Sequence, residues 1–145
     1  MAFFEGIITN KAIFLPIFSW FLAQFIKFIH FYLQHHKVDF RKFVASGGMP
    51  SSHSAISVCL ATVLGIENGF NSGIFAIGVI LAFIVMSDAT GVRRAAGKQA
   101  EVLNKLVYHS AEIKLEKELK VLLGHTPVQV IAGAALGMMV GILFA

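Results

Sequence analysis

Two histidines stand where apolar segments of the chain begin, and both are suited to chemistry. His53 follows Gly-Gly-Met-Pro-Ser-Ser and precedes the apolar run 54–66, while His125 precedes the Thr-Pro pair that opens the last apolar run, 127–145. Proline suits the first turn of a helix, and serine or threonine caps it. The sequence therefore predicts two helices that each begin at a histidine, a side chain able to attack phosphorus or transfer a proton.

The turn before His53 is suited to hold an anion. Gly47 and Gly48 let the backbone bend and expose its N–H groups, and Ser51 and Ser52 can cap the helix or donate to an oxyanion. The helix that follows directs the positive end of its dipole at the same place. We expect Gly48, Ser51 and Ser52 to bind phosphate.

Cations near the ends of the apolar runs extend this prediction. Ionisable groups inside or beside a membrane span are costly and are therefore functional candidates. The candidates for binding phosphate are Lys27, Arg41, Arg93, Arg94 and Lys98. Two histidines with several cations suit phosphoryl transfer, because one imidazole can carry the phosphoryl group while the other protonates the leaving oxygen and the cations stabilise the charge.

Neither a metal nor another cofactor is expected. Zinc is the competing use of two histidines, but two such ligands, with no cysteine beside them and Asp88 as the nearest carboxylate, are fewer than a usual zinc site has. The lone Cys59 lies in an apolar run and is interpreted as a packing residue.

The composition is that of a membrane protein. Of the 145 residues, 57% are hydrophobic and 14% charged, the mean hydropathy is +0.76, and the charged residues are grouped between apolar runs, as in loops between transmembrane helices. The runs are 12–33, 54–66, 72–87 and 127–145, the second being short for the about 20 residues that a bilayer requires. We expect one domain over residues 1–145, an all-α integral-membrane bundle of about four transmembrane helices.

Residues 97–123 depart from this pattern. Apolar residues recur there at helical spacing with charged residues between them, which predicts an amphipathic helical insertion that lies on the membrane surface or against the bundle before the last span. A solvated connector is the alternative interpretation of the same stretch.

Charge distribution predicts the orientation of the chain. The basic residues concentrate in segments 35–42 and 91–98, and the connection 67–71 has none, so the positive-inside rule places the two basic segments in the cytoplasm and both termini outside. The net charge of +4 does not indicate nucleic-acid binding, because the chain lacks a basic helix with interleaved aromatic residues.

The last apolar run carries a row of glycines. Gly133, Gly137 and Gly141 are spaced by four and share one face of the predicted helix. Small residues at this spacing let two helices approach closely, either within the bundle or between subunits. A homo-oligomer formed through these glycines is therefore one expectation.

At these motifs the chain resembles the type-2 phosphatidic acid phosphatase superfamily, which includes the vanadium haloperoxidases. That superfamily carries K-x6-R-P, P-S-G-H and S-R-x5-H-x3-D. Residues 50–53, Pro-Ser-Ser-His, resemble the second motif, and residues 124–133 resemble the end of the third. Segments 47–55, 87–94 and 123–137 are similar in particular to a divergent branch of small membrane proteins related to acid phosphatases and haloperoxidases.

The resemblance implies roles for the site residues. It implies a lipid phosphatase whose substrate is a lipid phosphomonoester or pyrophosphate, with His125 as the nucleophile that forms a phosphohistidine and His53 as the acid for the leaving group. Ser51, Ser52 and nearby backbone N–H groups would form the phosphate cradle. The bacterial-type plasma membrane is the expected location, and the positive-inside rule places the active face in the cytoplasm.

Departures from the superfamily pattern leave a second interpretation open. Leu119 stands where the third motif has its arginine, so Arg93 or Arg94 would have to supply that cation, and Gln129 stands where the motif has its aspartate. A glutamine carbonyl can fix the tautomer of an imidazole but cannot offset its developing charge. Asp88 is the candidate substitute, and the alternatives are an inactive phospholipid- or phosphate-binding protein and a scaffold assembled through the glycine face.

Overall fold

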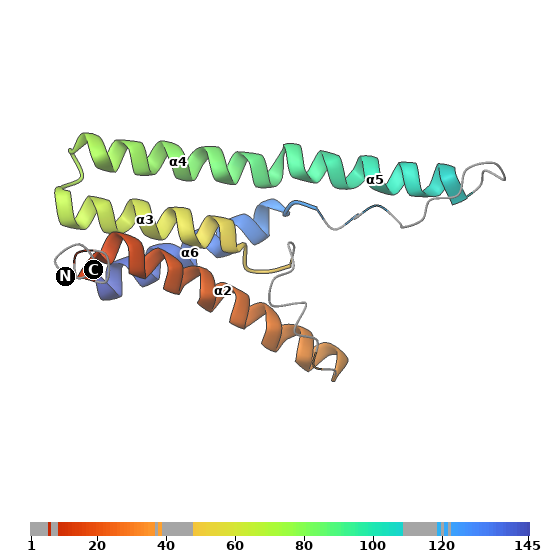
Figure 1. Cartoon of the computed structure of the whole chain (residues 1–145), viewed down its shortest axis with the longest axis horizontal. Coiled ribbons are helices and arrows are strands. Elements are labelled where there is room, and N and C mark those ends of the chain that lie inside the picture. The colour runs from red at the N-terminus through yellow and green to blue at the C-terminus, as the bar shows by residue number, and fades with distance from the viewer. Residues whose placement is uncertain are drawn as a thin grey trace.

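The structure, a computed structural model, describes residues 6, 9–36, 38, 48–108, 119, 121 and 123–145. Its helices follow one another along the chain as α2 (Lys11–His35), α3 (Ser52–Asn68), α4 (Gly73–Thr90), α5 (Val92–Tyr108) and α6 (Pro127–Phe144). No strand occurs among the described residues. The predicted all-α bundle is thus confirmed. Figure 1 shows α2, α4 and α6 packed around α3.

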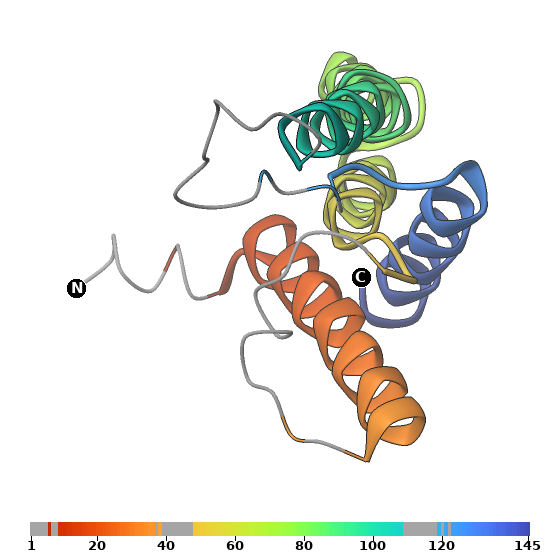
Figure 2. The same ribbon diagram turned by 90° about the vertical axis from the view of Figure 1, so that its right-hand side faces the viewer.

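Among the described residues, three segments are long and apolar enough to cross a membrane: Lys11–His35, Gly73–Val107 and Pro127–Phe144. The expected second span is shorter, since α3 has 17 residues. This helix packs against α2, α4 and α6 at the centre of the bundle, as the end view in Figure 2 shows. Its neighbours therefore shield it, and it can carry buried serines that a helix facing lipid could not hold without partners.

The predicted caps begin these helices. The side chain of Ser51 accepts from the Ser54 N–H at the start of α3, and Thr126 forms a capping box with Gln129 at the start of α6. Such contacts satisfy N–H groups that the first helical turn leaves without an intrahelical partner. The sequence locates both helix starts correctly for this reason.

The glycine row packs inside the chain. A Cβ at Gly133 would collide with the Ser51 carbonyl oxygen, and one at Gly137 with that of Ala55, while at Gly141 it would lie 2.7 Å from a Thr62 side-chain carbon. The three glycines are buried against α3. Close contact within the bundle, one of the two expectations for this face, is confirmed, because α3 of the same chain occupies the surface. A homo-oligomer through these glycines has no support from this packing.

The amphipathic stretch begins earlier than predicted. Helix α5 starts at Val92, directly after a single break at Gly91, and continues in line with α4 beyond the end of the bundle (Figure 1). It does not pack along the side of the bundle, because the α4–α5 junction keeps it on the axis of α4. The rest of the predicted insertion, 109–118, 120 and 122, lies outside the described residues.

A short returning segment is attached to α5. The Asn104 side chain donates to the Leu119 carbonyl at 2.9 Å and accepts from the Leu119 N–H at 3.0 Å. Gly97 lies so close to this segment that a Cβ there would be 2.9 Å from the Leu123 carbonyl oxygen. These contacts direct the chain back from α5 to the start of α6.

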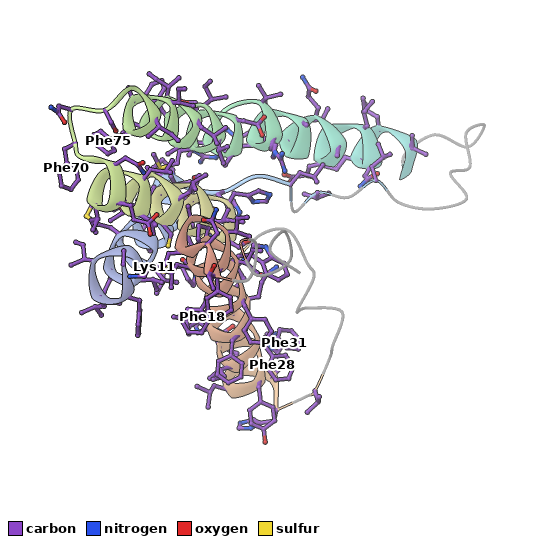
Figure 3. The ribbon with its side chains drawn as sticks, turned by 60° about the vertical axis from the view of Figure 1, so that its left-hand side comes forward. Lys11, Phe18, Phe28, Phe31, Phe70 and Phe75 are labelled. Carbon is purple, nitrogen blue, oxygen red and sulfur yellow. The ribbon has the colours of Figure 1, made fainter. Side chains whose placement is uncertain are left out.

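The two ends of the bundle differ in chemistry. The starts of α3 and α6 and the end of α4 lie at one end, whereas Lys11 donates to the carbonyl of Ala145 at the other (Figure 1). Aromatic residues are distributed along the rest of the bundle, with Phe18, Phe28 and Phe31 on α2 and the edge-to-face pair Phe70 and Phe75 at the α3–α4 turn (Figure 3). Both histidine turns therefore share one end.

Candidate active site

The two predicted histidines lie side by side. The ring centroids of His53 and His125 are 6.0 Å apart, with 59° between the ring planes. His53 is in the first turn of α3, and His125 is in the extended segment just before α6. Sequence spacing of 72 residues separates them, so only the helix packing brings them together.

Backbone hydrogen bonds hold both turns in place. The His125 N–H donates to the Ala89 carbonyl at 2.8 Å, which attaches the nucleophile candidate to the end of α4. The Ser51 N–H donates to the Gln129 carbonyl at 2.9 Å, which joins the His53 turn to α6. The glycine row permits this second bond, because a side chain at Gly133 would push α6 away from Ser51.

Gln129 fixes the ring of His125. Its Oε1 lies 3.3 Å from Nδ1 of His125 and accepts from the Thr126 N–H at 3.0 Å. The backbone N–H identifies the facing atom as the amide oxygen, because an NH₂ group there would oppose a donor. Nδ1 of His125 must then carry the proton, which leaves a lone pair on Nε2.

Burial favours the neutral form of His125. The residue is only 4% exposed, and this burial is the main cause that lowers the pKa of His125, with the charges of Lys27, His53 and Arg93 acting in the same direction. The hydrogen bond with Gln129 acts the other way. A neutral imidazole with a free Nε2 lone pair is the form that can attack an electrophile.

Arg93 is the arginine that reaches the histidines. Its Nη1 lies 3.4 Å from Nε2 of His53, and its Nε donates to Asp88 Oδ2 at 2.5 Å. Asp88 therefore pairs with Arg93, and the expectation that it replaces the missing carboxylate beside His125 is wrong. The α4–α5 junction explains this, because it turns Arg93 back over the last turn of α4.

Lys27 enters the site from α2. The residue is 8% exposed, and its Nζ donates to Gln24 Oε1 at 2.9 Å and to Ser52 Oγ at 3.2 Å. A Cβ at Gly48 would lie 3.8 Å from Cδ of Lys27, so the glycine turn rests beside the lysine stem. Lys27 is thus one of the expected cations, and it lies buried beside Ser52.

The remaining predicted cations lie elsewhere. The side chains of Arg94 and Lys98 are on the exposed surface of α5, and no side-chain contact from either to the histidines occurs in the described segments. The expectation that they bind phosphate is therefore not supported by their position, since successive helical residues point in different directions. Arg41 lies outside the described residues.

Two further groups support the site residues. Gln24 is a polar residue inside the first apolar run, which makes it a functional candidate from the sequence alone, and it accepts from Lys27 and holds its ammonium in place. The carbonyl of Ala89 holds His125. A backbone carbonyl leaves no trace in a sequence, so Ala89 could not have been found.

Two buried polar atoms lack a hydrogen-bond partner among the described residues: Nδ1 of His53 and Oγ of Ser54. Most buried polar groups in proteins are paired, so such exceptions ask for an explanation. Both lie in the first turn of α3.

Comparison with known proteins agrees with the resemblance described above. Residues 8–140 match the family described as Divergent PAP2. The chain is also 38% identical over 152 aligned residues to the uncharacterized membrane protein YuiD of Bacillus subtilis, a match that covers 96% of each chain. No solved structure matches. With nearly its whole length matched and its helices apolar enough to span a bilayer, the chain is a membrane protein that belongs to the Divergent PAP2 family.

Proposed function

We propose that this protein is a membrane lipid phosphatase that hydrolyses a phosphomonoester or pyrophosphate through a phosphohistidine, with no metal ion required. The observation that carries the proposal is the convergence of His53 and His125, with 6.0 Å between their ring centroids, beside Arg93. Two imidazoles, a guanidinium and the ammonium of Lys27 are the groups that metal-independent phosphoryl transfer needs.

His125 acts as the nucleophile. Gln129 holds the proton on Nδ1, so the Nε2 lone pair forms the bond to phosphorus while the bond from phosphorus to the leaving oxygen breaks. Water then attacks the phosphohistidine and releases inorganic phosphate, which restores the neutral ring.

His53 acts as the general acid and then the general base. It protonates the leaving oxygen in the first step and takes a proton from the attacking water in the second. Arg93, Lys27 and the N–H groups at the start of α3 stabilise the charge on the equatorial oxygens. Ser52 contributes indirectly, because its hydroxyl accepts from Lys27.

The position of the site favours a lipid as substrate. The histidines lie at the end of a bundle whose outer surface is apolar, where the phosphate of a membrane lipid would sit. The basic residues of the sequence segments 35–42 and 91–98 favour the cytoplasmic face of the plasma membrane by the positive-inside rule. A glycerolipid phosphate fits that face better than a carrier lipid recycled outside the cell.

Phosphate release by the purified protein tests this function. We expect release from at least one member of a panel of phosphatidic acid, phosphatidylglycerol phosphate and prenyl pyrophosphates in detergent micelles, in the presence of a chelator. His125→Ala and His53→Ala serve as inactive controls, and Lys98→Gln, at an exposed position on α5, serves as the matched active control. Binding of the same lipids without release from any of them would contradict the enzyme proposal.

A second candidate function rests on Gln129. The superfamily motif has a carboxylate at this position, and a neutral amide cannot offset an imidazolium charge. A phospholipid-binding protein that keeps the cradle without turnover would retain every contact described above. Lipid binding that depends on Lys27 and Arg93 but persists in His125→Ala, with no phosphate released, would identify this alternative.

A further inference from the structure

The geometry around Asp88 indicates a role other than orienting the nucleophile or binding a cation. Asp88 is the last acidic residue of α4, and its partner is Arg93 at the start of α5. The spacing of five residues is not that of neighbours on a regular helix surface, which are three or four apart. The break at Gly91 creates the pair, and the Gly91 N–H donating to the Ser87 carbonyl at 2.8 Å closes the end of α4.

The pair sets the direction of the arginine. A guanidinium is planar, so a hydrogen bond at Nε fixes the plane in which the two terminal nitrogens lie. With Nε on Asp88 at 2.5 Å, Nη1 is directed at Nε2 of His53 at 3.4 Å. The side chains of Arg93 and Asp88 are 48% and 38% exposed, so packing alone does not hold them.

The arginine in turn sets the tautomer of His53. A guanidinium has five N–H donors and no acceptor, so the imidazole nitrogen that faces it must offer a lone pair. Nε2 of His53 is therefore unprotonated in this arrangement, and the neutral ring carries its proton on Nδ1, the buried nitrogen that has no partner among the described residues. The other charged and titratable groups around His53 are Lys27 from α2 and His125 from the segment before α6.

We propose that Asp88 is a positioning residue, which aims Arg93 at Nε2 of His53 and so holds His53 in the Nδ1–H tautomer until an anion binds. This inference rests on the proposed phosphatase function for its consequence. Inorganic phosphate that binds Arg93 draws the guanidinium away and leaves a negative charge beside Nε2, which then takes a proton from solvent. His53 therefore gains the proton that it donates to the leaving oxygen when the anion binds.

The tautomer can be measured without turnover. The full chain, labelled with ¹⁵N-histidine in detergent micelles, gives long-range ¹H–¹⁵N correlations that distinguish Nδ1–H from Nε2–H, and His53→Ala assigns the signals. We expect the wild type to show the Nδ1–H form for His53 at pH 8, and Asp88→Asn and Arg93→Lys to show a mixture. Glu101→Gln, which removes an ion pair with Lys105 elsewhere on α5, should match the wild type.

Two results would overturn the inference. One is an Nε2–H tautomer for His53 in the wild type, and the other is a wild-type spectrum for His53 in both Asp88→Asn and Arg93→Lys while the His125 signals report a folded site. If the protein releases phosphate normally and either result is found, the positioning role is wrong and the proposed phosphatase function stands. An inactive protein with the expected tautomers would instead contradict the proposed function.

Titration with inorganic phosphate tests the protonation of His53 on anion binding. In the wild type, saturating phosphate at pH 7 should convert His53 from the Nδ1–H form to the doubly protonated form. Asp88→Asn, which already has a mixture of tautomers without phosphate, should show a smaller change in the Nε2 signal, and Asp88→Glu should recover part of the wild-type change. An Nε2 of His53 that stays unprotonated in saturating phosphate would contradict the proposal.

Discussion

The imidazole rings of His125 and His53 are held by contacts of different kinds, one local and one tertiary. His125 is fixed by its own helix: Gln129 is four residues away, and the same amide oxygen closes the capping box with Thr126. His53 is instead faced by Arg93, 40 residues away on another helix, which Asp88 holds. A hydrogen bond within one helix turn fixes the tautomer of the proposed nucleophile. A tertiary contact with a charged side chain fixes the tautomer of the proposed acid.

This difference bears on the glutamine that stands where the superfamily motif has aspartate. Gln129 serves the helix start as well as the imidazole, and its neutral amide suits a buried ring whose pKa is lowered chiefly by burial. Beside His53 the facing group is the guanidinium of Arg93, which Asp88 holds. The carboxylate therefore orients an arginine here, and not an imidazole.

The largest effect should separate the two histidines. His125→Ala should lower kcat at least about 10³-fold, because it removes the atom that bonds to phosphorus. His53→Ala should lower kcat about 10²-fold to 10³-fold, the usual contribution of general acid catalysis. Phosphate release measured with a lipid substrate checks the order, and a greater loss in His53→Ala than in His125→Ala would reverse the assignment.

The next effect should separate two neighbouring arginines. Arg93→Gln should lower kcat/KM on the order of 10²-fold, because a charged hydrogen bond to the transferring group is lost. Arg94→Gln makes the same chemical change on the exposed surface of α5 and should alter kcat/KM less than about twofold. Steady-state kinetics on the same lipid compare the pair, and equal losses would show that the α4–α5 junction does not select Arg93.

A carboxylate at position 129 sharpens the comparison further. Gln129→Glu keeps the length of the side chain, so it can still accept from His125 and Thr126 while it adds the missing charge. We expect kcat to rise about tenfold and the acid limb of its pH profile to move to higher pH, since the charge favours protonated His125. Gln129→Met is the matched control without an acceptor, and it should lower kcat.

Burial of His125 should also appear in the pH dependence of stability. The pKa of His125 lies below its ordinary value in the folded protein, so the unfolded chain binds the extra proton first as the pH falls. Stability from this residue is therefore present above about pH 6.5 and decreases as the pH falls through that value. The Tm of His125→Gln in micelles should fall less than that of the wild type between pH 7.5 and 5.5.

The matched control for this measurement is His30→Gln, at an exposed position on α2. Its Tm should follow the wild-type curve across the same pH range. Parallel curves for wild type and His125→Gln would show that burial of His125 makes no contribution to the pH dependence of stability.

Much of this arrangement could be predicted from the chain itself. Local chemistry indicates the helix starts, because Ser51, Thr126 and Pro127 act within one turn of their own positions. Four spans that cross the membrane in alternating directions predict that His53 and His125, at the starts of the second and fourth spans, share one end of the bundle. The glycine row indicates a close helix contact, although the sequence could not say that the contact is with α3 of the same chain.

What could not be predicted depends on how the helices are rotated and joined. Choosing Arg93 over Arg94, and assigning Asp88 to Arg93, requires the break at Gly91 and the direction of α5. The contact of Lys27 with Ser52 depends on the crossing of α2 and α3, and the attachment of His125 depends on a backbone carbonyl of Ala89. None of these is a property of a local sequence pattern.

The most direct test of the central claim is to trap the phosphohistidine. Wild-type protein mixed for milliseconds with a ³²P-labelled lipid phosphate and quenched in alkali, which preserves phosphohistidine, should carry the label on the peptide that contains His125. His53→Ala should still form the labelled enzyme slowly, and His125→Ala should not form it. Label on His53, or turnover with no label on either histidine, would contradict the account.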